Sequence, residues 1–314
     1  MSKAKILIFI FWIQLSFSQT SGAIYKQLKK FNTLSSVLYL AAHPDDENTR
    51  LISLFSNQYN TRTGYLSMTR GDGGQNLIGT ELREGLGLIR TQELLEARKI
   101  DGGEQYFTTA NDFGYSKNPE ETLKIWNKKE VLAQIVFRIR KFKPDIIVHR
   151  FDHRTPGSTH GHHTSSSMLS FEAFNLANDP NAFPEQLDKV SLWQPKRQFY
   201  NTSWWAYGSK KKFEKADKSN MIALESNPTD YILGRTNAEV AAKSRSQHKS
   251  QGFGSSPQLG SQLEYLEWIN GDKPSGNNPF SEVDTSWNRV SGGTIIKKLT
   301  DQLLVNFDYQ KPYN

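Results

Sequence analysis

The chain has 314 residues, of which 36% are apolar and 23% are charged. This composition is typical of a soluble globular protein and excludes a disordered or fibrous one. The chain contains no cysteine, so disulfide bonds, thiolate metal ligands and a cysteine-linked lipid are excluded. The formal net charge is +7, but the lysine-rich run at 208–218 also carries acids and is typical of a solvated helix face or loop. We therefore expect no nucleic-acid partner.

Residues 1–18 have the three-part pattern of a secretory signal peptide. Lys3 and Lys5 precede an apolar run from Ile6 to Ile13, and small residues suit a cleavage after Ser18. The pattern predicts export to the periplasm or out of the cell, with an uncleaved anchor as the alternative. No other segment is apolar enough to cross a membrane, so we expect no transmembrane segment in the mature chain.

The first element of the mature chain is an apolar run at 36–42, SVLYLAA, which is typical of a strand buried on both faces. Pro44 suits the first turn of a following helix. Asp45 and Asp46 suit the positive end of that helix, so the sequence predicts a strand-to-helix junction here. At such a junction His43 and Asp46, three residues apart, can point at one ion. Asp45 taken alone is better explained as a helix cap.

Strand and helix patterns then alternate along the chain. Strands are expected at 63–69, 105–109 and 143–150, and helices at 81–98 and 119–142, the latter broken near Lys128. This alternation predicts an α/β fold with a mainly parallel sheet flanked by helices. After about residue 178 the pattern weakens. We expect a core at 19–180, and residues 181–314 as a less regular part of the same domain or an extension, with the boundary left open.

Histidines gather directly after the strand predicted at 143–150. Five of the seven lie between residues 149 and 163, and the stretch ends in His160-Gly-His-His163. Reactive groups in α/β sheets gather at the carboxyl ends of strands, so this stretch and the His43 junction can share one ion. Imidazole and carboxylate ligands suit Zn²⁺ or a similar divalent metal. We expect His149 and His248 not to be ligands and leave His153 and His162 open.

Four motifs, in order, resemble those of the PIG-L/LmbE-like N-acetylglucosaminyl de-N-acetylase family. AAHPDDE at 41–47 resembles the family's first signature, and HGHH at 160–163 resembles its second, a His-x-x-His. TRGDGGQN at 69–76 resembles its Thr-Arg-Gly-acid-Gly turn, and LIRTQELLEARKI at 88–100 its Arg-x-x-Glu helix. The resemblance covers about residues 36 to 180, and the C-terminal part is similar to that of exported bacterial members.

The resemblance implies a Rossmann-like sheet and a zinc-dependent hydrolase that removes an acetyl group from an N-acetylated amino sugar or a related amide. It implies three ligands for Zn²⁺ or another divalent metal: His43, Asp46 and His163. It further implies Asp45 as general base on the metal-activated water, His160 as an imidazolium that stabilises the oxyanion, and Arg70 as a substrate-binding residue. The partner would be a small molecule or glycan that carries an N-acetyl group.

The second signature departs from the usual family pattern, because Gly161 and His162 replace a Pro-Asp pair. An acid that could orient a histidine is thereby missing, and Asp152 is a candidate substitute. Two alternatives therefore stay open: a carbohydrate-binding or scaffolding homologue without turnover, and a zinc esterase or amidase with a non-sugar substrate. The aromatic cluster at 193–207 suits either sugar stacking or ordinary packing. The oligomeric state is also open.

Overall fold

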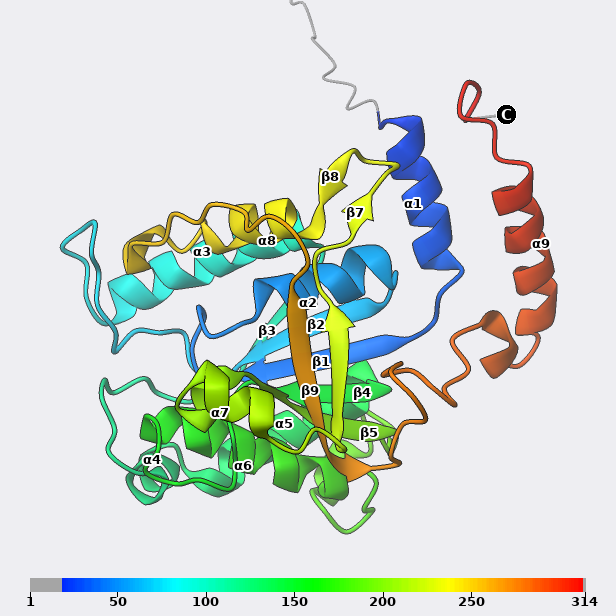
Figure 1. Ribbon diagram of the computed structural model, residues 1–314. Helices are drawn as coiled ribbons and strands as arrows, with labels where there is room; N and C mark the ends of the chain where they lie inside the picture. Colours follow the sequence, from blue (N-terminus) through cyan, green and yellow to red (C-terminus); the bar gives the residue numbers. More distant parts are fainter. Residues whose placement is uncertain (1–18, 313–314) are drawn as a thin grey trace, which may run out of the picture.

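The computed structural model describes residues 19–312, so the predicted signal peptide at 1–18 lies outside the described residues. At its centre is a seven-stranded sheet in the order β3-β2-β1-β4-β5-β9-β6 (Figure 1). The first five strands in this order are mutually parallel, and β9 is antiparallel to both of its neighbours. The predicted α/β class with a mainly parallel sheet is confirmed. The strand bounds are β1 Ser36–Ala41, β2 Arg62–Ser67, β3 Glu104–Phe107, β4 Ile146–His149, β5 Arg197–Thr202, β6 Met221–Glu225 and β9 Leu263–Gly271.

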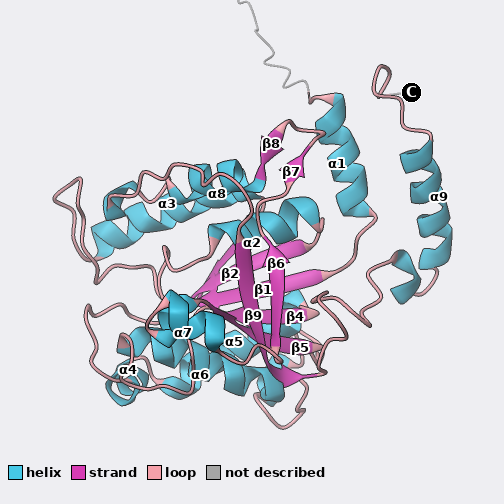
Figure 2. Cartoon of the chain, viewed as in Figure 1, coloured by secondary structure: helices cyan, strands magenta, loops and turns pink. Residues whose placement is uncertain are grey.

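Helices cover both faces of this sheet (Figure 2). One face carries α2 (Thr49–Ser53), which continues as a π-helical turn, and α3 (Glu84–Asp101), and α8 (Asn237–Arg245) packs against these two helices. The other face carries α4 (Pro119–Ile125), α5 (Lys128–Phe142) and α6 (Gly161–Leu176), so the predicted break near Lys128 is confirmed. Helix α1 (Ser21–Phe31) lies against α9 (Gly293–Val305). The short elements are α7 (Lys210–Lys215) and a ribbon of β7 (Thr229–Asp230) and β8 (Arg235–Thr236).

Strand β1 is the centre of the core because apolar side chains leave it in both directions. Leu38 and Leu40 pack with residues of α5 and α6, whereas Val37 and Tyr39 pack with residues of α2 and α3. All six residues of the strand are buried. A strand covered on both sides needs no polar face, which explains the continuous apolar run in the sequence.

The helix expected to begin at Pro44 begins instead at Thr49, so that prediction was wrong. The reason is a turn that uses the same residues. The Asp46 carboxylate accepts the backbone N–H of His43 at 2.7 Å, and the Asp46 N–H donates to the His43 carbonyl at 3.2 Å. Asn48 then caps α2, because its side chain accepts the N–H groups of Arg50 and Leu51.

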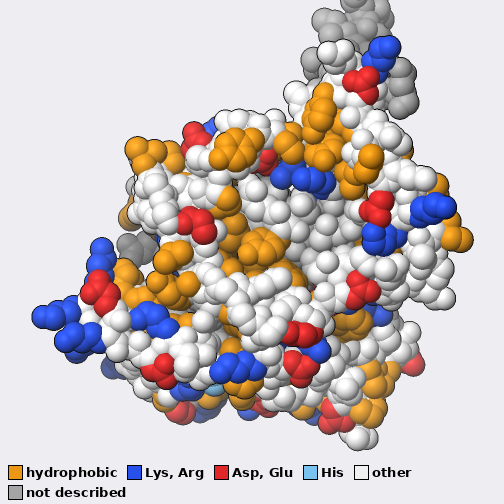
Figure 3. Space-filling view, turned by 45° about the vertical axis from the view of Figure 1, so that its right-hand side comes forward, with side chains coloured by type: hydrophobic (Ala, Val, Ile, Leu, Met, Phe, Trp, Pro, Cys, Tyr) orange, Lys and Arg blue, Asp and Glu red, His pale blue; other side chains and the backbone are white. Residues whose placement is uncertain are grey.

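The C-terminal part of the chain contributes to the same sheet. Strands β5, β6 and β9 all come from residues 181–314, and β5 pairs directly with β4. The lysine-rich run forms α7, where Phe213 is the buried residue. On the face in Figure 3, Lys and Arg side chains lie in several separate places with Asp and Glu among them. None of the described helices is both long and apolar enough to cross a membrane.

Candidate metal centre

Two loops meet at the carboxyl ends of the neighbouring parallel strands β1 and β4. The first loop follows Ala41 and contains His43 and Asp46. The second runs from Arg150 to the N-terminus of α6, where His160 is the capping residue. The sheet order therefore brings together two segments that are more than a hundred residues apart in the chain.

His43, Asp46 and His163 form one group able to hold a metal ion. Their ligand atoms all lie within 4.8 Å of one another. Nδ1 of His43 is 3.0 Å from Oδ2 of Asp46, and Nε2 of His163 is 3.5 Å from Oδ1 of Asp46. The structure thus places the three side chains that the family resemblance marks as ligands at one point. A zinc-binding His/Asp triad is possible here.

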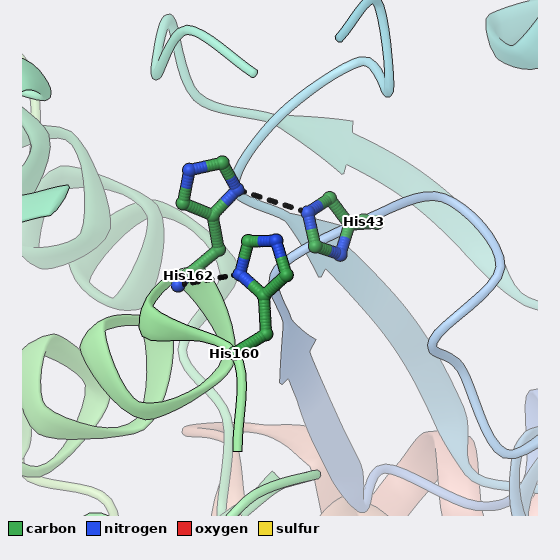
Figure 4. A group of neighbouring side chains, drawn as sticks. All are labelled: His43, His160 and His162. Carbon is green, nitrogen blue, oxygen red and sulfur yellow. Dashed lines mark hydrogen bonds between the residues drawn. The ribbon is translucent and has the colours of Figure 1, made fainter. Parts of the chain in front are cut away.

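A second group shares His43 and adds His160 and His162 (Figure 4). Nε2 of His43 lies 3.0 Å from Nδ1 of His162, and Nδ1 of His160 accepts the backbone N–H of His162 at 3.1 Å. His162 is fully buried, and its Nε2 has no hydrogen-bond partner within residues 19–312. The sequence left His162 open, whereas the structure places it against the metal-binding candidates.

Burial keeps most of these imidazoles neutral. Burial lowers the pKa of His162 to about 2 and the pKa of His163 to about 4. The nearby His43 adds to both shifts. The same two causes lower the pKa of His160. A neutral imidazole is the form that binds a metal. For His160 this direction favours the neutral ring, so the expected imidazolium stays a prediction.

His43 and Asp46 behave as a pair of opposite charges. Burial lowers the pKa of His43, but the adjacent Asp46 carboxylate, together with Asp112 and Asp45, raises it above its usual value. Burial likewise raises the pKa of Asp46, but His163 and His43 outweigh it and hold this pKa well below its usual range. The carboxylate is therefore ionised at neutral pH. Two imidazoles and one ionised carboxylate on fixed elements fit a divalent ion such as Zn²⁺.

Asp45 belongs to neither group, and its carboxylate pairs with the buried guanidinium of Arg90 in α3. Arg90 also donates to the Gly71 carbonyl at 3.0 Å. Gly71 has a φ of +72°, and a Cβ at this position would collide with that guanidinium. The glycine-rich turn at 69–76 and helix α3 therefore both help to hold the Asp45 side chain through Arg90.

Arg70 contacts neighbouring elements rather than the histidines. Its guanidinium lies over the ring of Phe107, 4.3 Å from the ring centroid, and it donates to the hydroxyl of Thr91 at 3.2 Å. The side chain is exposed, so the predicted role in substrate binding stays a prediction.

Asp112 is the acid that sequence reasoning missed. Its carboxylate is buried, with Oδ2 3.9 Å from Nε2 of His43 and Oδ1 3.8 Å from Nδ1 of His162. Asp152, the substitute suggested by the sequence, pairs with Arg154 at 2.8 Å, and the histidine it approaches is His153, which lies outside both metal-binding groups. Asp112 lies in an irregular loop without any motif, and no signal in the sequence singles it out.

The other histidines serve packing. His248 lies 2.6 Å from Glu47 in a fully buried pair, and His153 stacks on Phe171 with ring centroids 4.3 Å apart. His149 is buried in β4, where desolvation and the neighbouring His153 lower its pKa to about 3. None of the three belongs to a metal-binding group in the described part of the chain.

The structure accounts for the glycine at position 161 of the second signature. A Cβ at this position would collide with the carbonyl oxygen of Asn118 and the hydroxyl of Ser116. The backbone N–H of Gly161 also donates to the Ser116 carbonyl at 3.0 Å. The N-terminus of α6 thus approaches the loop before α4 too closely for a side chain.

Comparisons with known proteins agree with this geometry. Residues 38–174 match the family model described as PIG-L: GlcNAc-PI de-N-acetylase. No curated protein sequence matches the chain. Among solved structures, the N,N'-diacetylchitobiose deacetylase from Pyrococcus horikoshii is 18% identical with a TM-score of 0.50, over 69% of this chain and 70% of that one. GalB, the 4-carboxy-2-hydroxymuconate hydratase from Pseudomonas putida, is 13% identical with a TM-score of 0.50, over 77% of this chain and 99% of that one.

At these identities the two structures establish the fold and leave the reaction open, since one is a deacetylase and the other a hydratase. The family match covers both histidine-containing signatures, the glycine-rich turn and the Arg90 helix. The stretch from residue 38 to residue 174 is therefore similar in sequence to a PIG-L family domain.

Proposed function

We propose that the protein is a metal-dependent amide hydrolase that removes the acetyl group from an N-acetylated amino sugar. One observation carries the proposal. His43, Asp46 and His163 converge within 4.8 Å, next to Asp45, inside a segment that matches a de-N-acetylase family. The predicted signal peptide at 1–18 supports the further proposal that the substrate is met outside the cytoplasm.

A divalent ion held by His43, Asp46 and His163 would supply Lewis acidity and lower the pKa of a water molecule. The residues of the chain would carry the remaining tasks. Asp45 would accept the proton of the attacking water, with its carboxylate held by Arg90. His160, half-buried at the N-terminus of α6, would donate a hydrogen bond from its ring N–H to the oxyanion, and Asp45 would pass the proton taken from the water on to the leaving amine.

The test is acetate release from a panel of N-acetylated sugars by the zinc-loaded mature chain. The Asp45→Asn variant should lose about 10²- to 10⁴-fold in turnover, the range for a general base, while it keeps its zinc. Wild-type turnover in this variant would remove Asp45 from the mechanism.

The same panel separates the alternatives. Zinc binding without acetate release from any sugar would favour a carbohydrate-binding or scaffolding protein. Faster hydrolysis of O-acetyl than of N-acetyl sugars, or hydrolysis of non-sugar amides alone, would favour an esterase or amidase.

A further inference from the structure

A polar cavity of about 300 Å³ lies beside the metal centre. We name it the arginine cavity, because its lining includes Arg50, Arg150 and Arg245. These side chains come from three elements: α2, the loop after β4, and the end of α8. The cavity also reaches Glu47, the residue that follows Asp46 in the first signature.

The acids near this cavity are already used by other groups. Glu47 is buried and pairs with His248 at 2.6 Å and with Arg98 at 3.4 Å. Glu264 pairs with Arg50 at 2.5 Å. Two cationic side chains of the lining therefore remain without a carboxylate of their own.

Those two are Arg150 and Arg245. Within residues 19–312 neither forms an ion pair with an aspartate or glutamate. Arg150 donates to the amide oxygen of Asn201 at 3.2 Å. Arg245 lies over the ring of Phe253, 4.0 Å from its centroid, and donates to the backbone carbonyl of Asp45 at 3.3 Å. Both guanidinium groups are held by neutral partners, and the charges of Glu264 and Asp46 act on Arg150 only from outside ion-pair contact.

Both arginines also lie close to residues of the metal centre. Arg245 contacts the backbone of Asp45, as described above. Arg150 directly precedes Phe151, whose ring stacks on His163 with centroids 3.8 Å apart. Arg150 further lines two adjoining cavities of about 350 and 410 Å³, which share the exposed Trp205. Both arginines are thus held close to residues of the metal centre.

From this arrangement we infer that the arginine cavity binds an anionic group, a carboxylate or a phosphate, of the substrate. A guanidinium presents a planar fork of donors that matches either anion. The cavity with its excess of positive charge also attracts anions. This inference rests on the proposed function for the N-acetyl portion alone. The preferred substrate is then an acidic N-acetylated amino sugar rather than a neutral one.

Ligand binding tests the inference without relying on turnover. Three ligands are titrated into the zinc-loaded Asp45→Asn variant by calorimetry: N-acetylglucosamine, N-acetylmuramic acid and N-acetylglucosamine 6-phosphate. We expect one acidic sugar to bind at least about tenfold more tightly than the neutral one, and the advantage to shrink at high salt. Comparison of the two acidic sugars identifies the preferred anion.

The arginine substitutions locate the effect. Adding Arg245→Gln or Arg150→Gln should remove most of the tenfold advantage. Adding Arg235→Gln, which removes an exposed arginine of β8 outside these cavities, should keep it. Circular dichroism and thermal unfolding check that each variant is folded. If Arg150→Gln does not fold, the result for Arg245→Gln decides the test.

Equal binding of neutral and acidic sugars, an advantage that survives Arg245→Gln, or no saturable binding of any of the three would overturn the inference. Failure here is distinct from failure of the proposed function. Acetate release from neutral sugars without acidic preference rejects the anion site and leaves the hydrolase. Anion-selective binding without acetate release by the wild-type protein rejects the hydrolase and leaves the anion site.

Discussion

The Asp46 carboxylate holds His43 through two contacts of a single oxygen. Oδ2 of Asp46 accepts the backbone N–H of His43 at 2.7 Å and lies 3.0 Å from Nδ1 of the same imidazole. The other oxygen, Oδ1, lies 3.5 Å from Nε2 of His163. The short turn thus fixes one histidine and links it to the histidine that arrives from the second loop.

Zinc affinity should depend on pH through His43. Burial lowers its pKa, but the nearby acids, chiefly Asp46, raise it above the usual value, whereas the pKa of His163 is lowered to about 4. Below the pKa of His43 a proton competes with the metal, so affinity should fall about tenfold per pH unit as pH decreases. Above that pKa the affinity should level off. Competition with a chelating dye between pH 5.5 and 8.5 measures this, and a flat profile would contradict the role of His43.

Removal of the Arg90 guanidinium should slow turnover without loss of metal. Arg90 is buried and pairs with the Asp45 carboxylate. In Arg90→Gln this carboxylate loses its anchor, and we expect kcat to fall about 10- to 100-fold, the range for residues that orient a functional group. Zinc content and unfolding temperature are measured on the same sample, with Arg235→Gln as control. Unchanged kcat in folded, zinc-loaded Arg90→Gln would show that the ion pair does not position Asp45.

Gly161→Ala should destabilise the protein, because the added Cβ meets the carbonyl of Asn118 and the hydroxyl of Ser116. We expect the free energy of unfolding to fall by about 1–3 kcal/mol, the usual cost of overpacking. Gly254→Ala is the matched control, since a Cβ there meets nothing within 4 Å. Chemical denaturation measures both variants. Equal stability of the two would mean that the start of α6 can shift at little cost.

Trp205 should contribute to sugar binding. It is 76% exposed, stacks on Trp204 with centroids 4.6 Å apart, and lines the two cavities next to Arg150. Trp205→Ala should raise KM for the sugar about 5- to 10-fold, consistent with about 1 kcal/mol for one aromatic contact, and leave kcat nearly unchanged. Tyr231→Ala removes another exposed ring, on the β7–β8 ribbon, and should change neither constant. An unaltered KM in Trp205→Ala would assign the tryptophan pair to surface packing.

The sequence predicted the elements of the core better than their arrangement. Strands β1 and β4 are continuous apolar runs because both faces of each are covered, and this pattern is visible without a structure. That the two strands are neighbours depends on contacts between distant segments, which local patterns do not specify. That the two histidine-bearing stretches can share one ion followed from their positions after strands, whereas the choice of His163 as a ligand rested on the family resemblance.

The remaining differences have the same origin. The helix start was misplaced because the Asp46 side chain closes a turn with His43, a competing local hydrogen bond that propensity does not weigh. Asp112 approaches two histidines from an irregular loop. Likewise, Glu47 and His248 pair across 201 positions of the chain. Such long-range partners become visible only once the sheet order is known.

Metal analysis of the purified mature chain tests the central claim most directly, with His163→Ala compared against His153→Ala. His153 stacks on Phe171 outside both metal-binding groups, so its variant controls for loss of a histidine. We predict about one equivalent of zinc in the wild-type protein and in His153→Ala, and little in His163→Ala. A wild-type protein without bound metal, or zinc retained in full by His163→Ala, would contradict the assignment of the site.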